Sequence, residues 1–516
     1  MTENSLTESK SRVTHRLPSI PMLVVLQGGI SAASLVVEIV AGRMLAPYVG
    51  MSLYTWTAVI AVVLAGFSAG HWWGGRIAER PAARALRSTA WAMIGAALFT
   101  GGSVILLRWA GALLPHFSDP LSGILALTLL AFFLPSLFAG IPAPVLAQIS
   151  VSASPDASGR ALGAMFAAGA VGAIAGTVLA GFVFISWLGS VGTILAVTLF
   201  YALSATLLFR LARRAGGPVT GPTGAAMSAL AVLGVGLSAL QSPSPCTTES
   251  QYFCIRSMDV SADPAHPVWM MVLDHLVHGM TARELPHVMF TDHAALLDEL
   301  ARARHVPGFS AFFIGGGTFS IPRSWAALSP APRMTVAEID PVVTDIAARD
   351  FWFDPASARV LNMDARRALL IAPDRYDVIL GDAFTDIAVP SHLITQEFFQ
   401  LVQSRLTPGG TYLMNVIDHA DRLETLVSLA HTLQTVFPVV EIWTEAKKAG
   451  PQERMIFVLA AGDRPTPRDR IETLSPDPIL FARLPDGALD RLRQRIPPTL
   501  LTDDFAPIDR LMGLRL

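Results

Sequence analysis

The sequence predicts two fold classes in one chain: an α-helical transmembrane bundle of about seven spans, followed by an α/β doubly wound domain with a small β segment at its start. The 516 residues are 52% hydrophobic and only 15% charged, and nearly all the long apolar runs precede residue 242. After residue 247, strand and helix patterns alternate as in a globular domain. We assign a polar tail (1–20), a helical domain (21–242), a small β segment (247–280), an α/β domain (281–462) and a C-terminal extension (463–516).

The first half contains seven segments long enough to cross a hydrocarbon core, which takes roughly 18 apolar residues. The first segment is too long for a signal peptide and leads directly into further spans, so we expect a retained helix. Gly and Ala recur at spacings of three and four within residues 163–181, a pattern that lets helix backbones approach closely. The seven segments lie near 21–42, 54–75, 88–107, 121–149, 161–186, 190–209 and 224–241.

The Lys and Arg residues of the short connections predict the orientation, because they favour the cytoplasm. They cluster at 10–16, 76–87, 160 and 210–214, against Arg43 and Arg108 on the other side. The amino terminus is therefore predicted to be cytoplasmic. Seven spans place the C-terminal domain on the opposite side of the membrane, but a re-entrant or interfacial seventh segment would return it to the cytoplasm.

The two cysteines, Cys246 and Cys254, bear on the same question. In an oxidising compartment they form a local disulfide, and in a reducing one they remain two thiols. The sequence leaves both interpretations open.

Strands separated by helices follow from residue 311. We expect parallel strands at 311–314, 333–340, 358–364, 376–382 and 409–417, with helices at 341–351 and 395–406. Strands separated by helices of about ten residues form a doubly wound, Rossmann-like sheet, which binds ligands at the carboxyl ends of its strands.

Polar residues follow the first four of these strands. Three glycines, residues 315–317, follow the first strand and let a ligand approach the backbone. Glu338 and Asp340 end the second strand, at a distance from the glycines that suits a ribose-binding carboxylate; Asp364 ends the third and Asp382 the fourth. Each acid alone is as easily a helix cap or a turn residue. Together they predict a mononucleoside pocket in which Glu338, Asp364 and Asp382 line one cleft.

The C-terminal half carries a family resemblance. The segments "YFCIRS", "MMVLDHLVHG", "HVMF", "FFIGGG", "AEIDPVV", "NMDARRAL", "YDVILGDAF" and "LTPGGTYLMNV" come in the order and spacing of spermidine synthase-like aminopropyltransferases, whose α/β domain is of the methyltransferase type. The helical half, with "GRALGAMFAAGAVGAIAGTVLAGFVFISWLG", resembles the transporter-like region of bacterial membrane proteins fused to such a domain. The likeness of the synthase part covers about residues 247–460.

The resemblance implies the site. Its donor is decarboxylated S-adenosylmethionine, with the ribose held at Glu338, the adenine at Asp364 and the catalytic aspartate at Asp382. A carboxylate there binds the ammonium of the acceptor and helps remove its proton, and no metal is required. The implied cofactor-binding residues are Gly315, Gly316, Gly317, Glu338, Asp340, Asp364 and Ala365.

The sequence also departs from the family pattern around the acceptor. Thr318 stands where the family's GGGDG has its Asp, His278 where LDGxxQ has its Gln, and Pro286 where YHEM has its Tyr. Asp386 comes one residue later than the second acid of the DSSDP turn. We take His278, His287 and Asp386 as candidate acceptor-binding residues, although surface or strand-end positions explain the two histidines equally well.

Three functions remain open: aminopropyl transfer, methyl transfer from S-adenosylmethionine itself, and a sensor domain that binds an adenosyl ligand or polyamine and regulates the helices. The expected partners are a small amine substrate and the lipid bilayer. A net charge of -2 gives no general attraction to nucleic acid. The resemblance implies a multi-pass protein of the bacterial inner membrane, and its β segment implies a homo-oligomer.

Overall fold

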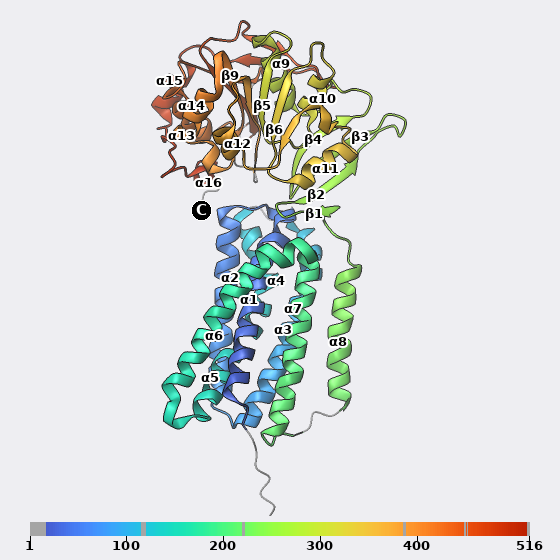
Figure 1. Ribbon diagram of the computed structural model, residues 1–516, viewed down its shortest axis with the longest axis vertical. Helices are drawn as coiled ribbons and strands as arrows, with labels where there is room; N and C mark the ends of the chain where they lie inside the picture. Colours follow the sequence, from blue (N-terminus) through green and yellow to red (C-terminus); the bar gives the residue numbers. More distant parts are fainter. Residues whose placement is uncertain are drawn as a thin grey trace, which may run out of the picture. The chain divides into compact units, whose positions relative to one another are not determined.

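Figure 1 shows a computed structural model of the chain. It describes residues 17–114, 120–218, 222–384, 389–447, 450 and 453–512. The chain divides into two compact units: one comprises residues 1–45 and 54–243, the other residues 46–53 and 244–516. We call them the helical unit and the sheet unit.

The helical unit is built from long apolar helices. Six of its helical segments, counted over the described residues, are long and apolar enough to span a membrane, against the seven spans that we predicted. The helices are α1 (Ile20–Val49), α2 (Leu53–Ala78), α3 (Ala82–Gly111), α4 (Pro120–Gly140), α5 (Pro142–Ser152), α6 (Ser158–Leu179), α7 (Ile185–Arg214) and α8 (Pro222–Gln241).

The difference in number arises at one segment. Residues Pro155–Arg214 form a single helical stretch of 60 residues that contains two of the predicted spans. A straight helix of that length would extend about 90 Å, roughly three times the thickness of a hydrocarbon core. Gly189 has non-helical angles (φ 67, ψ 178) within the stretch, and Figure 1 shows α6 and α7 running in opposite directions.

Glycines bring the helix backbones together, as the spacing predicted. A Cβ on Gly172 of α6 would lie 2.1 Å from the carbonyl oxygen of Gly28 in α1, and one on Gly176 would lie 2.2 Å from that of Ala32. In α2, a Cβ on Gly70 would lie 2.1 Å from the carbonyl oxygen of Leu137 in α4. Any larger residue at these positions would push the helices apart.

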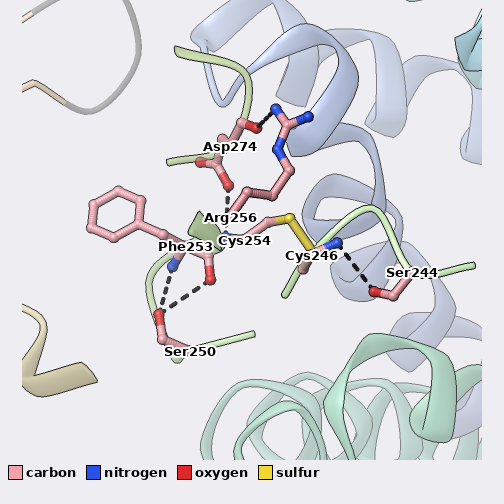
Figure 2. The surroundings of a disulfide bond; sticks show 7 residues. All are labelled: Ser244, Cys246, Ser250, Phe253, Cys254, Arg256 and Asp274. Carbon is pink, nitrogen blue, oxygen red and sulfur yellow. Dashed lines mark hydrogen bonds between the residues drawn. A yellow bond between two sulfur atoms is a disulfide. The ribbon is translucent and has the colours of Figure 1, made fainter. Parts of the chain in front are cut away.

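The sheet unit begins with a four-stranded antiparallel sheet in the order β1-β2-β3-β4. A disulfide between Cys246 and Cys254 closes the loop that leads into it, as Figure 2 shows. Beside it, the backbone N–H of Cys254 donates to Oδ1 of Asp274 over 2.9 Å. The strands are β1 (Thr248–Glu249), β2 (Cys254–Asp259), β3 (Val268–Leu273) and β4 (Leu276–Ala282).

The second sheet has nine strands in the order β12-β13-β10-β11-β9-β8-β5-β6-β7. Its five parallel strands are those that the sequence predicted: β5 (Ser310–Ile314), β6 (Arg333–Ala337), β7 (Arg359–Leu361), β8 (Tyr376–Gly381) and β9 (Leu406–His419). Four antiparallel strands extend the sheet beyond β9: β10 (Val439–Glu445), β11 (Arg454–Gly462), β12 (Arg470–Glu472) and β13 (Leu480–Arg483). The segment after residue 462 thus belongs to the same sheet.

Helices cover both faces of this sheet. On one face α9 and α10 pack against Phe313, Val336 and Leu380; on the other α12, α13 and α14 pack against Phe312 and Ile379. Alternate residues of β5 and β8 therefore point to opposite cores, as expected for buried parallel strands. The helices are α9 (Asp292–Arg304), α10 (Ser320–Ala326), α11 (Pro341–Asp350), α12 (Ala365–Ile371), α13 (Gln396–Arg405), α14 (Glu424–Gln434), α15 (Ala488–Arg495) and α16 (Ile508–Leu511).

Candidate functional site

The glycine loop after β5 is shaped by close backbone contacts. Gly315 has φ 92, and a Cβ on it would lie 2.6 Å from the carbonyl oxygen of Asp382. A Cβ on Gly316 would lie 2.3 Å from the ring of Phe319, which is fully buried and stacks on Phe353 at 4.2 Å between ring centroids. The loop therefore accepts no side chain at these positions unless its surroundings move.

Glu338, directly after β6, fastens this loop. Its Oε2 accepts the backbone N–H of Gly316 over 2.8 Å, and its Oε1 accepts that of Asp340 over 3.0 Å. The side chain is 6% exposed, and this burial raises the pKa of its carboxyl. The ribose contact predicted for Glu338 thus falls on a carboxylate that already holds the glycine loop.

Asp340 and Asp364 cap helices. Oδ1 of Asp340 accepts the N–H of Val342 at the start of α11 over 3.0 Å, and its Oδ2 accepts the hydroxyl of Ser250. Oδ1 of Asp364 accepts the N–H of Arg367 at the start of α12 over 2.9 Å. Its Oδ2 lies 2.7 Å from Nε2 of His392. Both acids perform the capping role that the sequence left open.

A cavity opens beside the glycine loop at the ends of β5 and β8. Among its lining residues are Gly315, Gly316, Thr318, Asp382 and two histidines, His278 of β4 and His293 of α9. Of the three carboxylates expected in one cleft, only Asp382 lines this cavity; Glu338 and Asp364 do not. The cavity therefore joins the glycines to the predicted catalytic aspartate.

Asp382 is held from one side and open on the other. Its Oδ1 accepts a hydrogen bond of 2.9 Å from Nδ2 of Asn415, a β9 residue that is 1% exposed. Its Oδ2 lies 3.6 Å from Nε2 of His293, outside hydrogen-bonding distance. The side chain of Asp382 remains 31% exposed, so one oxygen is available to a ligand.

His278, one of the predicted acceptor-binding residues, also lines the cavity. Burial lowers its pKa to about 4, although Asp382 opposes the shift. The imidazole is therefore neutral at physiological pH, so one ring nitrogen can donate a hydrogen bond and the other can accept one.

Thr318 stands at the position of the aspartate in the GGGDG pattern, and its side chain is buried. It is 2% exposed, its hydroxyl bonds that of Ser320, and a Cβ on Gly279 would lie 2.3 Å from its Oγ1. Gly279 of β4 and Thr318 are therefore in direct contact, and a hydroxyl replaces a carboxylate at this wall of the cavity.

The remaining predicted residues lie elsewhere. Nδ1 of His287 lies 3.4 Å from the Ser324 hydroxyl and does not line the cavity. Gly317 (φ 52) faces the carbonyl of His278, and Ala365 is buried at the start of α12. Asp386 lies outside the described residues. Within those residues, no group of three or more His, Cys, Asp or Glu side chains is arranged to hold a metal ion.

Sequence reasoning missed two residues of this site, His293 and Asn415. Asn415 was detectable as the single amide in the apolar strand "TYLMNVI". His293 gave no comparable indication, because its contact with Asp382 joins two distant parts of the chain.

Known proteins resemble part of the chain, although no family model matches it. A Bifidobacterium longum protein named "Probable polyamine aminopropyl transferase" is 34% identical over 129 residues, which are 25% of this chain and 29% of that protein. A polyamine aminopropyltransferase of Vibrio vulnificus is 40% identical over 106 residues, 20% of this chain and 35% of that protein. The matched segments thus span about a third of each relative's length.

Two further similarities were found. An N-terminal histidine N-methyltransferase of Emericella nidulans is 29% identical over 168 residues, 31% of this chain and 29% of that protein. The crystal structure of a probable spermidine synthase from Corynebacterium glutamicum covers 43% of this chain and 81% of its own, with 23% identity and a TM-score of 0.40. Part of the chain is therefore homologous to polyamine aminopropyltransferases.

Proposed function

We propose that the sheet unit is a spermidine synthase-like transferase that moves an aminopropyl group from decarboxylated S-adenosylmethionine to an amine. The observation that carries the proposal is the position of Asp382, which lines a cavity together with Gly315 and Gly316 and bonds Asn415 through one of its two oxygens. The ends of β5 and β8 belong to the edge where a doubly wound sheet binds ligands. The polyamine aminopropyltransferase relatives support this choice of donor.

Asp382 has the charge and position that this chemistry needs. An amine acceptor arrives protonated, and the carboxylate binds its ammonium and helps to remove one proton. The neutral nitrogen then attacks the carbon bound to the sulfonium, which leaves as a thioether. Because the sulfonium is already a good leaving group, holding the two reactants in line supplies much of the remaining rate enhancement.

For the donor, we propose that the nucleoside lies along the glycine loop toward β6 and β7. A carboxylate has about four acceptor positions, so Glu338 retains capacity for ribose hydroxyls after its two backbone bonds. Asp364 and Ala365, at the end of β7 and the start of α12, are proposed to border the adenine.

Methyl transfer from S-adenosylmethionine is the second candidate. Aminopropyl transfer needs a partner for the amine of the donor, and the wall where the family has an aspartate is Thr318 here. Asp382 is the only carboxylate among the described residues that line the cavity. The similarity to a histidine N-methyltransferase points the same way.

We further propose that the helical unit anchors the transferase in a membrane with the sheet unit on the oxidising side. The disulfide between Cys246 and Cys254 supports this side, and so do the charged connections. Fusing alkaline phosphatase or green fluorescent protein to the carboxyl terminus tests it: we expect an active phosphatase and a dark fluorescent protein. The reverse pattern would place the domain in the cytoplasm.

The test of the reaction offers the full-length protein decarboxylated S-adenosylmethionine and S-adenosylmethionine, each with a panel of amines, and detects the products by mass spectrometry. We expect Asp382→Asn to lower the rate by roughly 100-fold or more while donor binding persists. Asp374→Asn, which removes an exposed carboxylate that lies 3.7 Å from Arg359, is the matched control. Donor binding without product from any combination would favour the sensor function instead.

A further inference from the structure

Two groups from separate elements flank Asp382, which lines the cavity. Asn415 of β9 donates to Oδ1 of Asp382 over 2.9 Å, and Oδ2 of Asp382 lies 3.6 Å from Nε2 of His293. Asn415 is 1% exposed, so it fixes the plane of the carboxylate. The His293 side chain is 17% exposed and is carried by the first turn of α9. The carboxylate therefore has a buried amide bonded to one oxygen and an imidazole of the cavity wall near the other.

An aspartate carboxylate has too low a proton affinity to retain a proton that it takes from an ammonium group. Reference pKa values are about 3.9 for an aspartic acid, 6.5 for an imidazole and 10.4 for an alkylamine. Passing the proton from a carboxylate to an imidazole therefore improves its retention by roughly 400-fold. Proton removal from the acceptor becomes more favourable if an imidazole stands behind the aspartate.

His293 is the group in this cavity that fits the task. Asp382, His278 and His293 are the titratable residues among the described ones that line it, and Asp292 is the acidic residue in the first turn of α9. Burial lowers the pKa of His278 to about 4, which makes that imidazole a poor proton acceptor. The other walls present the hydroxyl groups of Thr291, Thr318 and Ser320, which do not take up a proton near neutral pH. The Thr291 hydroxyl lies 3.5 Å from Nε2 of His293.

We propose that His293 receives the proton that the acceptor amine loses, with Asp382 as the carboxylate through which it passes. For this transfer the 3.6 Å between Oδ2 of Asp382 and Nε2 of His293 must shorten to hydrogen-bonding distance when the acceptor binds, as catalytic contacts commonly do. The role rests on the proposed transfer function. The ammonium gives one proton to His293, the freed nitrogen lone pair forms the new N–C bond, and the electron pair of the broken C–S bond stays on sulfur. The products are a neutral thioether, an alkylated ammonium and an imidazolium next to Asp382. Asn415 is a positioning residue in this arrangement.

The first test is the pH dependence of transfer in His293→Gln, which keeps a hydrogen-bonding side chain but cannot hold the proton. We expect the turnover rate with putrescine or propylamine to fall about 100-fold at pH 7, with donor binding unchanged. The deficit should shrink toward pH 10, because more of the acceptor then arrives neutral. A deficit of the same size at every pH would show that His293 has only a structural role.

The matched control is His266→Gln, which changes an exposed histidine paired with Asp263 at 3.0 Å. It should leave the pH profile unaltered. If the wild-type protein releases no thioether from either donor with any amine, the proposed function fails and this role fails with it. An active wild type whose His293→Gln variant follows a parallel pH profile overturns the role alone.

A second measurement needs no turnover. Carbethoxylation by diethyl pyrocarbonate, read for each histidine by peptide mass spectrometry, gives the rate at which His293 reacts at pH 7 in the full-length protein. Because Oδ2 of Asp382 lies 3.6 Å from Nε2 of His293, the substitution Asp382→Asn should change this rate. His266 should not change. An unchanged value for His293 would show that the two groups do not interact and would overturn the proposal.

Discussion

The ends of three parallel strands, β6, β7 and β8, use their carboxylates in two different ways. After β6 and β7, Glu338, Asp340 and Asp364 bond backbone N–H groups and side chains of the protein with both of their oxygens. After β8, Asp382 bonds Asn415 with one oxygen, and within the described residues the other accepts no hydrogen bond. Exposure does not separate the two groups, since the side chains of Asp364 and Asp382 are 33% and 31% exposed.

The second oxygen separates them: it is bonded within the protein in Glu338, Asp340 and Asp364, whereas Asp382 bonds Asn415 through one oxygen only among the described residues. A carboxylate that caps a helix or holds a loop shapes the site, whereas a carboxylate with a free oxygen beside a cavity is ready for a charged ligand. The β6–β7 side therefore builds the pocket and the β5–β8 side performs the chemistry. Substitutions at Gly316, His278 and Asp340 test this division.

The largest effect is expected from Gly316→Ala, where the two sides meet. The new Cβ would lie 2.3 Å from the fully buried Phe319 ring, while the backbone N–H of residue 316 itself is held by Glu338. The loop must move, which should cost about 1–3 kcal/mol of stability and weaken donor binding more than tenfold. Thermal unfolding and calorimetric titration with S-adenosylmethionine measure the two losses.

A second substitution distinguishes crowding from other causes. Phe319→Leu leaves more room beside residue 316, so the double variant Gly316→Ala/Phe319→Leu should recover part of the lost donor affinity. If Gly316→Ala binds the donor as well as wild type does, the glycine loop is not part of the donor site and the division fails.

Much of this arrangement could be predicted from the sequence. The parallel strands are near-continuous apolar runs, so the sequence alone predicts β5 to β9 and the residues that follow them. The roles of the acids could not be separated in the same way. An aspartate between a strand and a helix has one local pattern whether it caps the helix or binds a ligand, and only the partners of Asp340 and Asp364 decide between them.

Contacts between residues that are far apart in the sequence could not be predicted from it either. Asp382 meets His293 because α9 packs beside β5 and β8, an arrangement that no local pattern reports. The sequence does not decide the disulfide for a related reason, since two cysteines eight residues apart bond only if β2 and the preceding loop bring them together.

An effect of intermediate size is expected on the β5–β8 side, where the titration of His278 makes the stability of the fold depend on pH. In the folded protein the pKa of His278 is lowered to about 4 by burial, against about 6.5 when unfolded. Between these values the unfolded chain binds a proton that the folded one does not. Stability is therefore lost as pH falls from 6.5 toward 4, and the loss from pH 7 to pH 5 should be about 2 kcal/mol.

His278→Gln removes this titration, so its denaturation midpoint should fall less than that of wild type between pH 7 and pH 5. His266→Gln supplies the comparison, because His266 is exposed. Glu338 acts in the opposite sense, since burial raises its pKa and its folded form retains a proton longer as pH rises. Parallel curves for wild type and His278→Gln would mean that His278 is not held neutral by the fold.

The smallest effect is expected on the β6–β7 side, from the paired substitutions Asp340→Ala and Asp340→Asn. Alanine removes the cap of α11 and leaves the buried Ser250 hydroxyl without this acceptor, which should cost about 1–2 kcal/mol. Asparagine keeps an oxygen for the cap and should cost less than half as much. If Asp340 only shapes the pocket, donor affinity should be retained by the asparagine variant. A loss of donor affinity of tenfold or more in Asp340→Asn, with stability preserved, would show that the charge itself binds the nucleoside and would move this acid from the building side to the binding side.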